Sequence, residues 1–560
     1  MRCVVVGGVA GGMSFAARAR RLDESAEIIV LERGPYVSFA NCGLPYYVGG
    51  EIEDRSKLLV QTPASLAASL NLDVRTGHNV IGVNPDDHEI TVEHDGVQHT
   101  MSYDRLILSP GAAAIRPDID GLDASTRVFT LRSVDDAIGI RGAVESGMRR
   151  AVVLGAGFIG IEAAEALRMM GLETTIVELA PHVLPPLDDE QASLVTDELT
   201  RLGIAVRSGA GATSIVPGTD SDTVILTDGT EIDADIIVLS VGVRPDTAFL
   251  DSSGIERERG AIIIDEHGRT SLGDVYAVGD ATISTDPITG VRRPVALAGP
   301  ANRAGRLVAD HVMRPDTARP IPQPLGTSIV RVGALTAAMT GANRRALGAA
   351  GIPFHTLHLH PAQHAGYFPG ASQIHLTVHI GNDGRILGAQ AVGADGVDKR
   401  IDVLATTIRN GAHVGDLIDL DLSYSPPYGQ AKDAVNLAGM VGTNVLDGTL
   451  RLWYAEDLET VSETALILDV RNAAEVATGM LPHALHIPHT ELRERLDEVI
   501  EAAAGRPVRV MCASGVRSAI AHRVLTQAGF DSASLSGGIL TLRAVLGERA
   551  AAALPQMQNV

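Results

Sequence analysis

The sequence predicts an α/β protein of several domains, and three observations indicate this fold class. The chain has 560 residues, enough for three or four domains of about 150 residues each. A strand, a glycine-rich turn, a helix and a second strand follow one another twice, over residues 3–32 and 151–178. Buried strands alternate with helices again beyond residue 465. Strands alternating with helices are typical of parallel sheets covered by helices.

The composition excludes several functional classes. The net charge of −22 disfavours non-specific binding to nucleic acid or to an anionic membrane, so neither partner is expected. No apolar run reaches the roughly 18 residues of a membrane span. Glycines interrupt the apolar stretch before Ala17, which favours a strand, a loop and a helix over a signal peptide. Three cysteines make no disulfide scaffold, and we expect a cytoplasmic protein.

The first strand–turn–helix–strand unit runs through strand Cys3–Val6, helix Ser14–Leu22 and strand Glu27–Leu31. Its turn departs from G-x-G-x-x-G because Val9 stands at the second glycine position. A later strand leads into Gly-Asp at 279–280, and Asp280 could hold the ribityl or phosphate end of a flavin. We therefore expect FAD to contact Gly7, Gly8, Val9, Ala10, Gly11, Gly12, Glu32, Arg33, Asn41, Gly111 and Asp280.

The second unit carries a complete G-x-G-x-x-G between strand Ala151–Leu154 and helix Ile161–Met170, and strand Thr174–Val177 follows. The first glycine permits the turn, the second admits the pyrophosphate, and the third lets the helix pack on the strand. Glu178 can bind a ribose 2′-hydroxyl and would repel a 2′-phosphate, which favours NADH while NADPH stays an alternative. The expected contacts are Gly155, Gly157, Gly160, Glu178 and Gly242.

Loop patterns divide the chain. The joins 109–112 and 240–245 indicate crossings between two interleaved Rossmann-like domains, for FAD (1–110 and 266–322) and NAD(P)H (111–265). Four prolines between 315 and 324 mark a linker. An α+β dimerisation domain is then expected over 323–446, and a C-terminal α/β domain over 450–560. The elements expected in these two domains are strands Ser328–Val332, Ile374–Ile380 and Ile386–Val392, helix Lys399–Asn410, strand Ala465–Val470, helix Glu491–Ala503, strand Val508–Met511 and helix Val516–Ala528.

Two of the three cysteines lie in loops suited to sulfur chemistry. Cys42 follows the first nucleotide motif, within Ser38–Tyr47, whereas Cys3 belongs to an apolar strand and is expected in the core. Cys512 begins a six-residue loop whose N–H groups, together with the next helix N-terminus and Arg517, can stabilise a thiolate or persulfide. The histidines show no metal-binding pattern, and the cluster His355, His358, His360 and His364 is interpreted as structural.

These motifs carry a family resemblance. Residues 1–445 resemble the coenzyme A-disulfide reductase branch of the FAD-dependent pyridine nucleotide-disulfide oxidoreductases, through 7–12, 38–47, 155–162, 276–280 and 422–428. Residues 450–560 resemble a rhodanese domain, through Asp469-Val470-Arg471, Glu475 and the Cys512 loop. The whole chain resembles fusions of the two that act as NADH-dependent persulfide or polysulfide reductases.

The resemblance implies roles for individual residues. Cys42 would be the single redox-active nucleophile over the flavin, with coenzyme A as its mixed-disulfide partner. Tyr367 and Tyr424 would be active-site tyrosines that reach across a homodimer. Arg18, Arg20 and Arg21 themselves offer a local cationic patch that the net charge of the chain otherwise lacks. The branch's lysine near Leu70 is missing here, so we expect either weaker binding of coenzyme A or a looser pocket. The implied substrate contacts are Ser14, Arg18, Arg21, Ser38, Asn41, Tyr367, Tyr428, Lys432 and Arg517.

The expected reaction follows from these roles. NADH reduces FAD, and Cys42 attacks a coenzyme A persulfide or disulfide, while Tyr367 or Tyr424 helps the leaving group. Cys512 carries sulfane sulfur from polysulfide, and its transfer requires direct sulfur-to-sulfur access. Two alternatives stay open. One is an NADH oxidase or peroxidase in which Cys42 cycles through a sulfenate. The other is a sulfurtransferase whose flavoprotein portion senses redox state.

Overall fold

The computed structural model describes residues 1–555 and divides into two compact units. The first comprises residues 1–181 and 202–326, and the second comprises residues 182–201 and the chain from Thr327 onward. The sequence placed residues 182–201 in the NAD(P)H segment, but their helix packs within the second unit. Among the described residues, no helix is long and apolar enough to cross a membrane.

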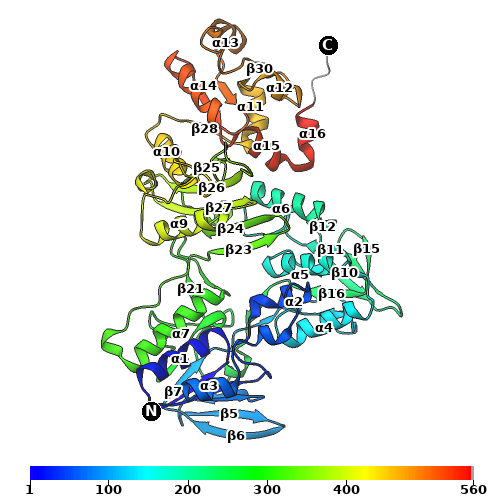
Figure 1. Cartoon of the computed structure of the whole chain (residues 1–560), viewed down its shortest axis with the longest axis vertical. Coiled ribbons are helices and arrows are strands. Elements are labelled where there is room, and N and C mark those ends of the chain that lie inside the picture. Colours follow the sequence, from blue (N-terminus) through cyan, green and yellow to red (C-terminus); the bar gives the residue numbers. More distant parts are fainter. Residues whose placement is uncertain (556–560) are drawn as a thin grey trace. The chain divides into compact units, whose positions relative to one another are not determined.

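A five-stranded parallel sheet begins the first unit, in the order β20-β7-β1-β2-β3. Helices α1 (Ala10–Leu22) and α7 (Ala298–Met313) cover one face, side by side in blue and green in Figure 1. Cys3 is fully buried in this core, as expected. The three-stranded sheet β4-β5-β6 contributes to the core on the other face. The strands are β1 (Arg2–Val6), β2 (Glu27–Glu32), β3 (Asp73–Thr76), β4 (Asn79–Asn84), β5 (Glu89–His94), β6 (Val97–Ser102), β7 (Arg105–Leu108) and β20 (Val275–Ala277).

Helix α1 begins four residues earlier than the sequence predicts, because Gly11 and Gly12 lie inside it. A Cβ on Gly12 would lie 2.0 Å from the carbonyl oxygen of Gly7, and one on Gly305 of α7 would lie 2.1 Å from that of Gly11. These glycines serve close packing rather than helix termination, which explains the error in the predicted start.

A second five-stranded parallel sheet in the first unit has the order β12-β11-β10-β16-β9. Helix α5 (Phe158–Met169) follows β10 and packs on it, and α4 (Val134–Glu145) packs near β9. The predicted strands differ from the observed ones by one residue at their ends. The elements are β9 (Val128–Phe129), β10 (Arg150–Leu154), β11 (Glu173–Glu178), β12 (Ile204–Ser208), β16 (Ile236–Leu239), and the separate sheet β13 (Ala212–Val216), β14 (Asp222–Leu226) and β15 (Glu231–Ala234).

The second unit contains an antiparallel sheet in the order β23-β24-β27-β26-β25. Helix α6 (Asp189–Arg201) is held against this sheet, because the Asp188 N–H donates to Gln390 Oε1 at 2.7 Å and Gln191 Nε2 donates to Thr377 Oγ1 at 2.9 Å. The remaining elements are β23 (Ser328–Val332), β24 (Leu335–Gly341), β25 (Phe354–Leu359), β26 (Ile374–Gly381), β27 (Ile386–Gly393), α9 (Val397–Arg409) and α10 (Ala434–Leu446).

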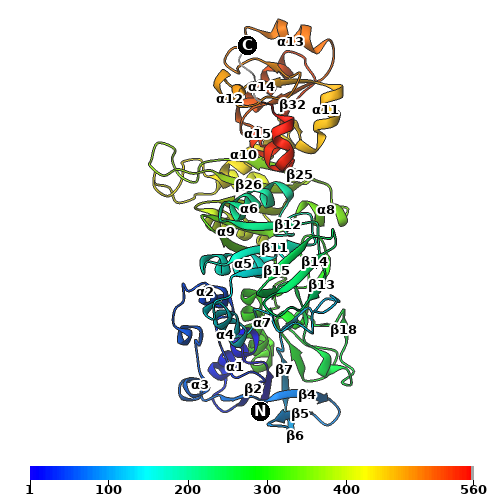
Figure 2. The ribbon, with the colours of Figure 1, turned by 90° about the vertical axis from the view of Figure 1, so that its right-hand side faces the viewer.

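The C-terminal part of the second unit is a parallel sheet in the order β28-β32-β31-β29-β30. Two apolar clusters fill its two faces, and Cys512 belongs to one of them. Helix α14 packs against β32, as their positions in Figure 2 also show. The elements are β28 (Leu452–Trp453), α11 (Leu458–Thr464), β29 (Leu466–Asp469), α12 (Ala473–Ala477), β30 (Leu485–His486), α13 (Leu496–Ala503), β31 (Val508–Met511), α14 (Val516–Gln527), β32 (Ser532–Leu535) and α15 (Gly538–Leu546).

Candidate active sites of the two units

The first glycines of the two glycine turns in the first unit have nearly the same φ. Gly7 has φ +99° and Gly155 has φ +100°, a conformation that side chains disfavour. A Cβ on Gly7 would lie 2.1 Å from the carbonyl oxygen of Ser109, and one on Gly155 would lie 2.5 Å from that of Ser240. The sequence indicated 109 and 240 only as crossing points between domains. Both serines in fact close a glycine turn, a role visible only in the fold.

The two turns differ at the second glycine position, which is Gly157 in one and Val9 in the other. A Cβ built on Gly157 meets nothing within 4 Å, although its φ of −73° is ordinary for any residue. The equivalent Val9 precedes α1 and already carries a side chain. The third glycine is equally confined in both turns, since a Cβ on Gly160 would lie 1.9 Å from the carbonyl oxygen of Gly155. The turn at 155–160 therefore leaves open space where a pyrophosphate would approach the backbone.

Each turn has a carboxylate at the end of the following strand. Glu32 ends β2, and Glu178 ends β11. Both accept two backbone N–H groups at 2.6–2.8 Å, from Gly8 and Gly34 at Glu32 and from Ala156 and Ala180 at Glu178. These bonds fix each carboxylate next to its glycine turn, the position that a ribose hydroxyl would reach in a bound dinucleotide.

Asp280 lies in a short turn after β20, close to Arg132. Arg132 in turn lies close to Gly111, another residue expected to contact FAD. Arg132 Nη2 is 3.7 Å from the Asp280 carboxylate, and a Cβ on Gly111 would lie 3.2 Å from the same nitrogen. Burial raises the pKa of Asp280, and Arg132 opposes that effect. Arg132 was missed by the sequence analysis because it lies about 150 residues from Asp280. Arg33 pairs with Asp246 at 2.6 Å.

The Cys42 segment is joined to the first glycine turn. Cys42 lies in a 3₁₀ turn (Asn41–Gly43) and is exposed. The Ser38 N–H donates to the carbonyl oxygen of Gly8 at 2.9 Å. Ser38 has φ +47°, a strained conformation for a residue with a side chain. The loop that leads to Cys42 is therefore attached to the predicted dinucleotide turn through Ser38.

Glu162 adds a charge that the sequence analysis did not assign. This residue lies on α5, and its Oε1 accepts a hydrogen bond from the Tyr46 hydroxyl at 3.3 Å. Partial removal of water by the surrounding protein, and then the charge of Glu162, raise the pKa of the Cys42 thiol, although its residue keeps an exposed surface. The thiol form is therefore favoured near neutral pH, and reaction as a nucleophile requires the proton to leave. The motif 155–162 contained Glu162, but only the fold places it near Cys42.

The residues expected to bind a coenzyme on α1 differ in their surroundings. Ser14 donates to Asn302 Oδ1 at 2.6 Å, and Arg18 Nε donates to Asp310 Oδ1 at 2.6 Å. Arg21 is exposed. The expectation for Arg20 was wrong: its guanidinium is 3% exposed and donates to four backbone carbonyl oxygens, those of Asp23, Glu24, Leu70 and Asn71. It fastens the end of α1 and belongs to no surface patch.

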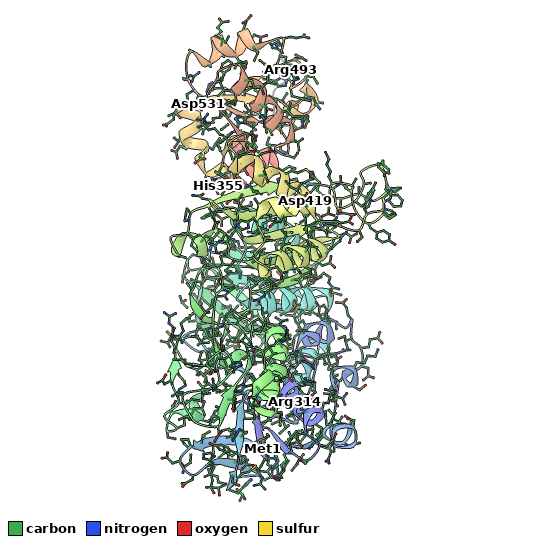
Figure 3. All side chains as sticks on the ribbon, turned by 90° about the vertical axis from the view of Figure 1, so that its left-hand side faces the viewer. Met1, Arg314, His355, Asp419, Arg493 and Asp531 are labelled. Carbon is green, nitrogen blue, oxygen red and sulfur yellow. The ribbon has the colours of Figure 1, made fainter. Side chains whose placement is uncertain are left out.

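The predicted tyrosines of the second unit lie together on exposed loops. The hydroxyls of Tyr367 and Tyr424 are 3.3 Å apart, and this hydrogen bond raises the pKa of Tyr367. Tyr367 is 77% exposed, Tyr424 48% and Tyr428 74%, and Lys432 is also exposed. Figure 3 shows an arm of loops projecting beside the labelled Asp419. None of the three phenols is a core side chain, so they are free to meet a ligand or a second chain.

Cys512 is buried at the carboxyl end of β31. Its thiol donates to Ser518 Oγ at 3.3 Å, and the Gly515 N–H donates to its sulfur at 3.2 Å. The structure thus records one of the expected backbone donors, at the start of α14. The positive charge expected from Arg517 is largely engaged elsewhere, because its guanidinium donates twice to Glu475 at 2.6 Å.

The surroundings of the Cys512 loop include a cavity and a buried ion pair. The cavity has a volume of about 360 Å³, and its walls include Arg471, Ala513 and Arg543. Arg471 pairs with Asp469 at 2.7 Å, and both side chains are at most 2% exposed. In the sequence, Asp469 and Arg471 were only part of the resemblance to a rhodanese domain. The fold gives them a task, since this pair fixes the strand next to the Cys512 strand.

His358, His360 and His364 of the histidine cluster form hydrogen bonds with other protein groups. His358 lies 2.9 Å from Glu190 Oε1 and 2.8 Å from Ser536 Oγ, and His360 lies 2.8 Å from Thr541 Oγ1. Among residues 1–555, no group of three or more His, Cys, Asp or Glu side chains is arranged to hold a metal ion.

Comparison with known families follows the same division. Residues 1–305 match the family described as pyridine nucleotide-disulphide oxidoreductase, residues 327–435 match its dimerisation domain, and residues 451–543 match the rhodanese-like domain. The chain belongs to the pyridine nucleotide-disulphide oxidoreductases, enzymes with an FAD- and NAD(P)-binding fold, and it carries a rhodanese-like domain.

Several individual proteins are similar to most of this chain. Coenzyme A disulfide reductase of Staphylococcus epidermidis is 34% identical over 443 residues, which cover 78% of this chain and 99% of the relative. The solved structure of reduced CoADR-RHD from Bacillus anthracis is 39% identical, with a TM-score of 0.95 and 98% of each chain covered. An NAD-dependent persulfide reductase from A. fulgidus is 35% identical, with a TM-score of 0.91, and covers 97% of this chain and all (100%) of its own. Water-forming NADH oxidase from Lactobacillus brevis is 25% identical, with a TM-score of 0.77 over 80% of this chain and 99% of its own.

Proposed function

We propose that this protein is an FAD-dependent NADH oxidoreductase that reduces coenzyme A persulfide, polysulfide or coenzyme A disulfide at Cys42. The observation that carries the proposal is one exposed thiol, Cys42, four residues after Ser38, whose backbone N–H binds the first glycine turn. The second loop cysteine, Cys512, belongs to a rhodanese-like domain. The names of the relatives support the same substrates. A homodimer is part of the proposal, supported by the dimerisation domain.

The residues of the two turns fit two dinucleotides. The open space at Gly157 suits a pyrophosphate, and Glu178 suits the unphosphorylated ribose of NADH. The turn at 7–12, with Glu32 and the Gly111–Asp280 cluster, suits FAD. When bound, FAD would take a hydride from NADH and supply two electrons to sulfur.

The chemistry proposed for Cys42 begins with loss of its proton. The thiolate attacks the inner sulfur of coenzyme A persulfide, so that a Cys42–coenzyme A disulfide forms and hydrosulfide leaves. Two electrons then reduce this disulfide to the Cys42 thiolate and free coenzyme A. With coenzyme A disulfide as substrate, one coenzyme A thiolate leaves in the first step instead. Because the environment raises the pKa of Cys42, the thiolate depends on the bound cofactors and substrate for its stabilisation.

The tyrosines and Cys512 have separate tasks in the proposal. Tyr367 or Tyr424 gives a proton to the departing hydrosulfide or thiolate. The Cys512 thiolate attacks a polysulfide and retains one sulfur atom as a persulfide, while the shortened polysulfide leaves. A coenzyme A thiolate then attacks the terminal sulfur of that persulfide, which releases the Cys512 thiolate and forms coenzyme A persulfide. The Gly515 N–H and Ser518 support the sulfur at Cys512.

The test is anaerobic NADH oxidation by the FAD-loaded protein, with coenzyme A persulfide, coenzyme A disulfide, polysulfide together with coenzyme A, or hydrogen peroxide as acceptor. Wild type, Cys42→Ser and Cys512→Ser are compared. The proposal expects rapid persulfide turnover that disappears in Cys42→Ser, and a loss in Cys512→Ser confined to polysulfide. Rapid peroxide turnover with little persulfide activity would instead support a peroxidase or oxidase, an alternative favoured by the similarity to a water-forming NADH oxidase. Sulfur transfer without NADH use would support the sulfurtransferase alternative.

A further inference from the structure

Tyr367 and Tyr424 lie on two separate loops, and both loops are bound by the same buried side chain. The first tyrosine loop, residues 360–373, lies between β25 and β26 and carries Tyr367. The second tyrosine loop, residues 420–433, precedes α10 and carries Tyr424. Exposed loops are mobile unless something fixes them. A fixed distance between two phenols on such loops therefore needs a support beneath both.

Arg400 supplies that support. It lies on α9, is 2% exposed, and donates to both carboxylate oxygens of Asp433 at 2.7 and 3.2 Å. The same guanidinium donates to the carbonyl oxygen of Gln363 at 2.8 Å and to that of Gly396 at 3.1 Å. Gln363 belongs to the first tyrosine loop and Asp433 ends the second. One side chain thus binds the bases of both loops.

The buried charge of Arg400 is paired with the carboxylate of Asp433. The side chain of Asp433 is 4% exposed, and it also caps α10 by accepting the Val435 N–H at 3.2 Å. Removing two charges from water costs free energy that their attraction regains only with good geometry and further hydrogen bonds. A buried pair of this kind adds little net stability compared with apolar residues of similar size, but it does fix a geometry.

Direct contacts between the loops are hydrogen bonds between uncharged groups, whereas the bonds from Arg400 to Asp433 are charge-assisted. The Ala365 N–H donates to the carbonyl oxygen of Pro426 at 3.4 Å, and Gln430 Nε2 donates to that of Ala362 at 2.5 Å. Beyond these, the loops meet at the hydroxyls of Tyr367 and Tyr424. The fork of Arg400 fixes both loops to one helix, whereas a lysine has no planar fork and would hold only part of this network.

We propose that Arg400 and Asp433 are positioning residues for the tyrosine pair, holding the two loops so that one phenol can deliver its proton to the leaving sulfur. This inference rests on the proposed reductase function. Neither residue touches a reacting atom; both act through the loops. A displacement of about 1 Å at a catalytic group can lower a rate by roughly a hundredfold. Weakening the hydrogen bonds of Arg400 to the two loops should therefore lower persulfide turnover and leave the reaction of NADH with the flavin unchanged.

The test compares wild type, Arg400→Lys and the exposed control Arg385→Lys, whose guanidinium bonds Asp383 at the surface. We expect Arg400→Lys to lower kcat for coenzyme A persulfide by roughly 10- to 100-fold. The rate of flavin bleaching by NADH in anaerobic stopped flow should stay at the wild-type value, as should both rates in Arg385→Lys. Wild-type kcat in Arg400→Lys would overturn the proposal, whereas absence of persulfide turnover in wild type would instead reject the proposed function.

A double-mutant cycle separates positioning from general damage. In a Tyr367→Phe/Tyr424→Phe background, Arg400→Lys should cost little further activity, because the groups it positions are already gone. A full additional loss in that background would overturn the proposal. If Arg400→Lys does not fold, Asp433→Asn replaces it. The amide retains an oxygen for the α10 cap and loses the charge, and the same rates and the same cycle decide the outcome.

Discussion

Two glycines three residues apart should respond to the same substitution in opposite ways. In Gly160→Ala the new methyl group would lie 1.9 Å from the carbonyl oxygen of Gly155 and 2.7 Å from Ser240 Oγ. Since one neighbour is the backbone of the turn and the other is the serine that closes it, α5 must move away from β10. Overpacking of this kind costs about 1–3 kcal/mol. In Gly157→Ala the methyl group meets nothing within 4 Å at an allowed φ of −73°, so the free energy of unfolding should change by less than about 0.5 kcal/mol.

For dinucleotide binding we expect the opposite order: Gly157→Ala, which hardly changes stability, should weaken NADH binding directly. The methyl group of Gly157→Ala would occupy the space into which the pyrophosphate approaches the backbone. A tenfold to hundredfold weaker NADH affinity corresponds to about 1.4–2.8 kcal/mol. The measurements are thermal unfolding of the full chain and NADH titration by fluorescence, for both variants and wild type. Wild-type NADH affinity in Gly157→Ala, or equal destabilisation by the two substitutions, would refute the reasoning.

Three further predictions concern the C-terminal domain. Arg471→Met leaves Asp469 buried without its partner and should cost about 3–5 kcal/mol in urea unfolding, whereas adding Asp469→Leu should recover much of that loss; equal stability of the two variants would contradict this. Burial lowers the pKa of His522 to about 4. The unfolded chain then binds the proton first, so stability should fall as pH drops from about 6.5 towards 4, and His522→Asn should remove that part of the slope in unfolding measured across this range. Arg517 holds the pKa of Glu475 at about 2, and Glu475→Gln should free this arginine and speed the alkylation of Cys512 by iodoacetate several-fold, with unchanged rates counting against the pairing.

The local motifs could be predicted from the sequence because their chemistry depends on neighbouring residues. A glycine turn between a strand and a helix requires particular φ values and the absence of side chains, and both requirements are visible in the residue types at 7–12 and 155–160. The acidic residue at the end of the next strand, here Glu178, lies a fixed number of residues away. The loop after Cys512 is likewise a contiguous segment. Most strand boundaries agree within one residue for the same reason.

Only the tertiary structure could decide which distant side chains meet. The sequence gives Arg18 and Arg20 the same character, yet Arg20 is buried among carbonyl oxygens because the loop at Leu70 closes over it. Glu162 lies near Cys42, and Arg400 joins two loops, through contacts between residues 33 to 120 positions apart. The charge and hydrogen-bonding capacity of these residues are set by the sequence. Their partners are set by how the sheets and helices pack, which no local pattern encodes.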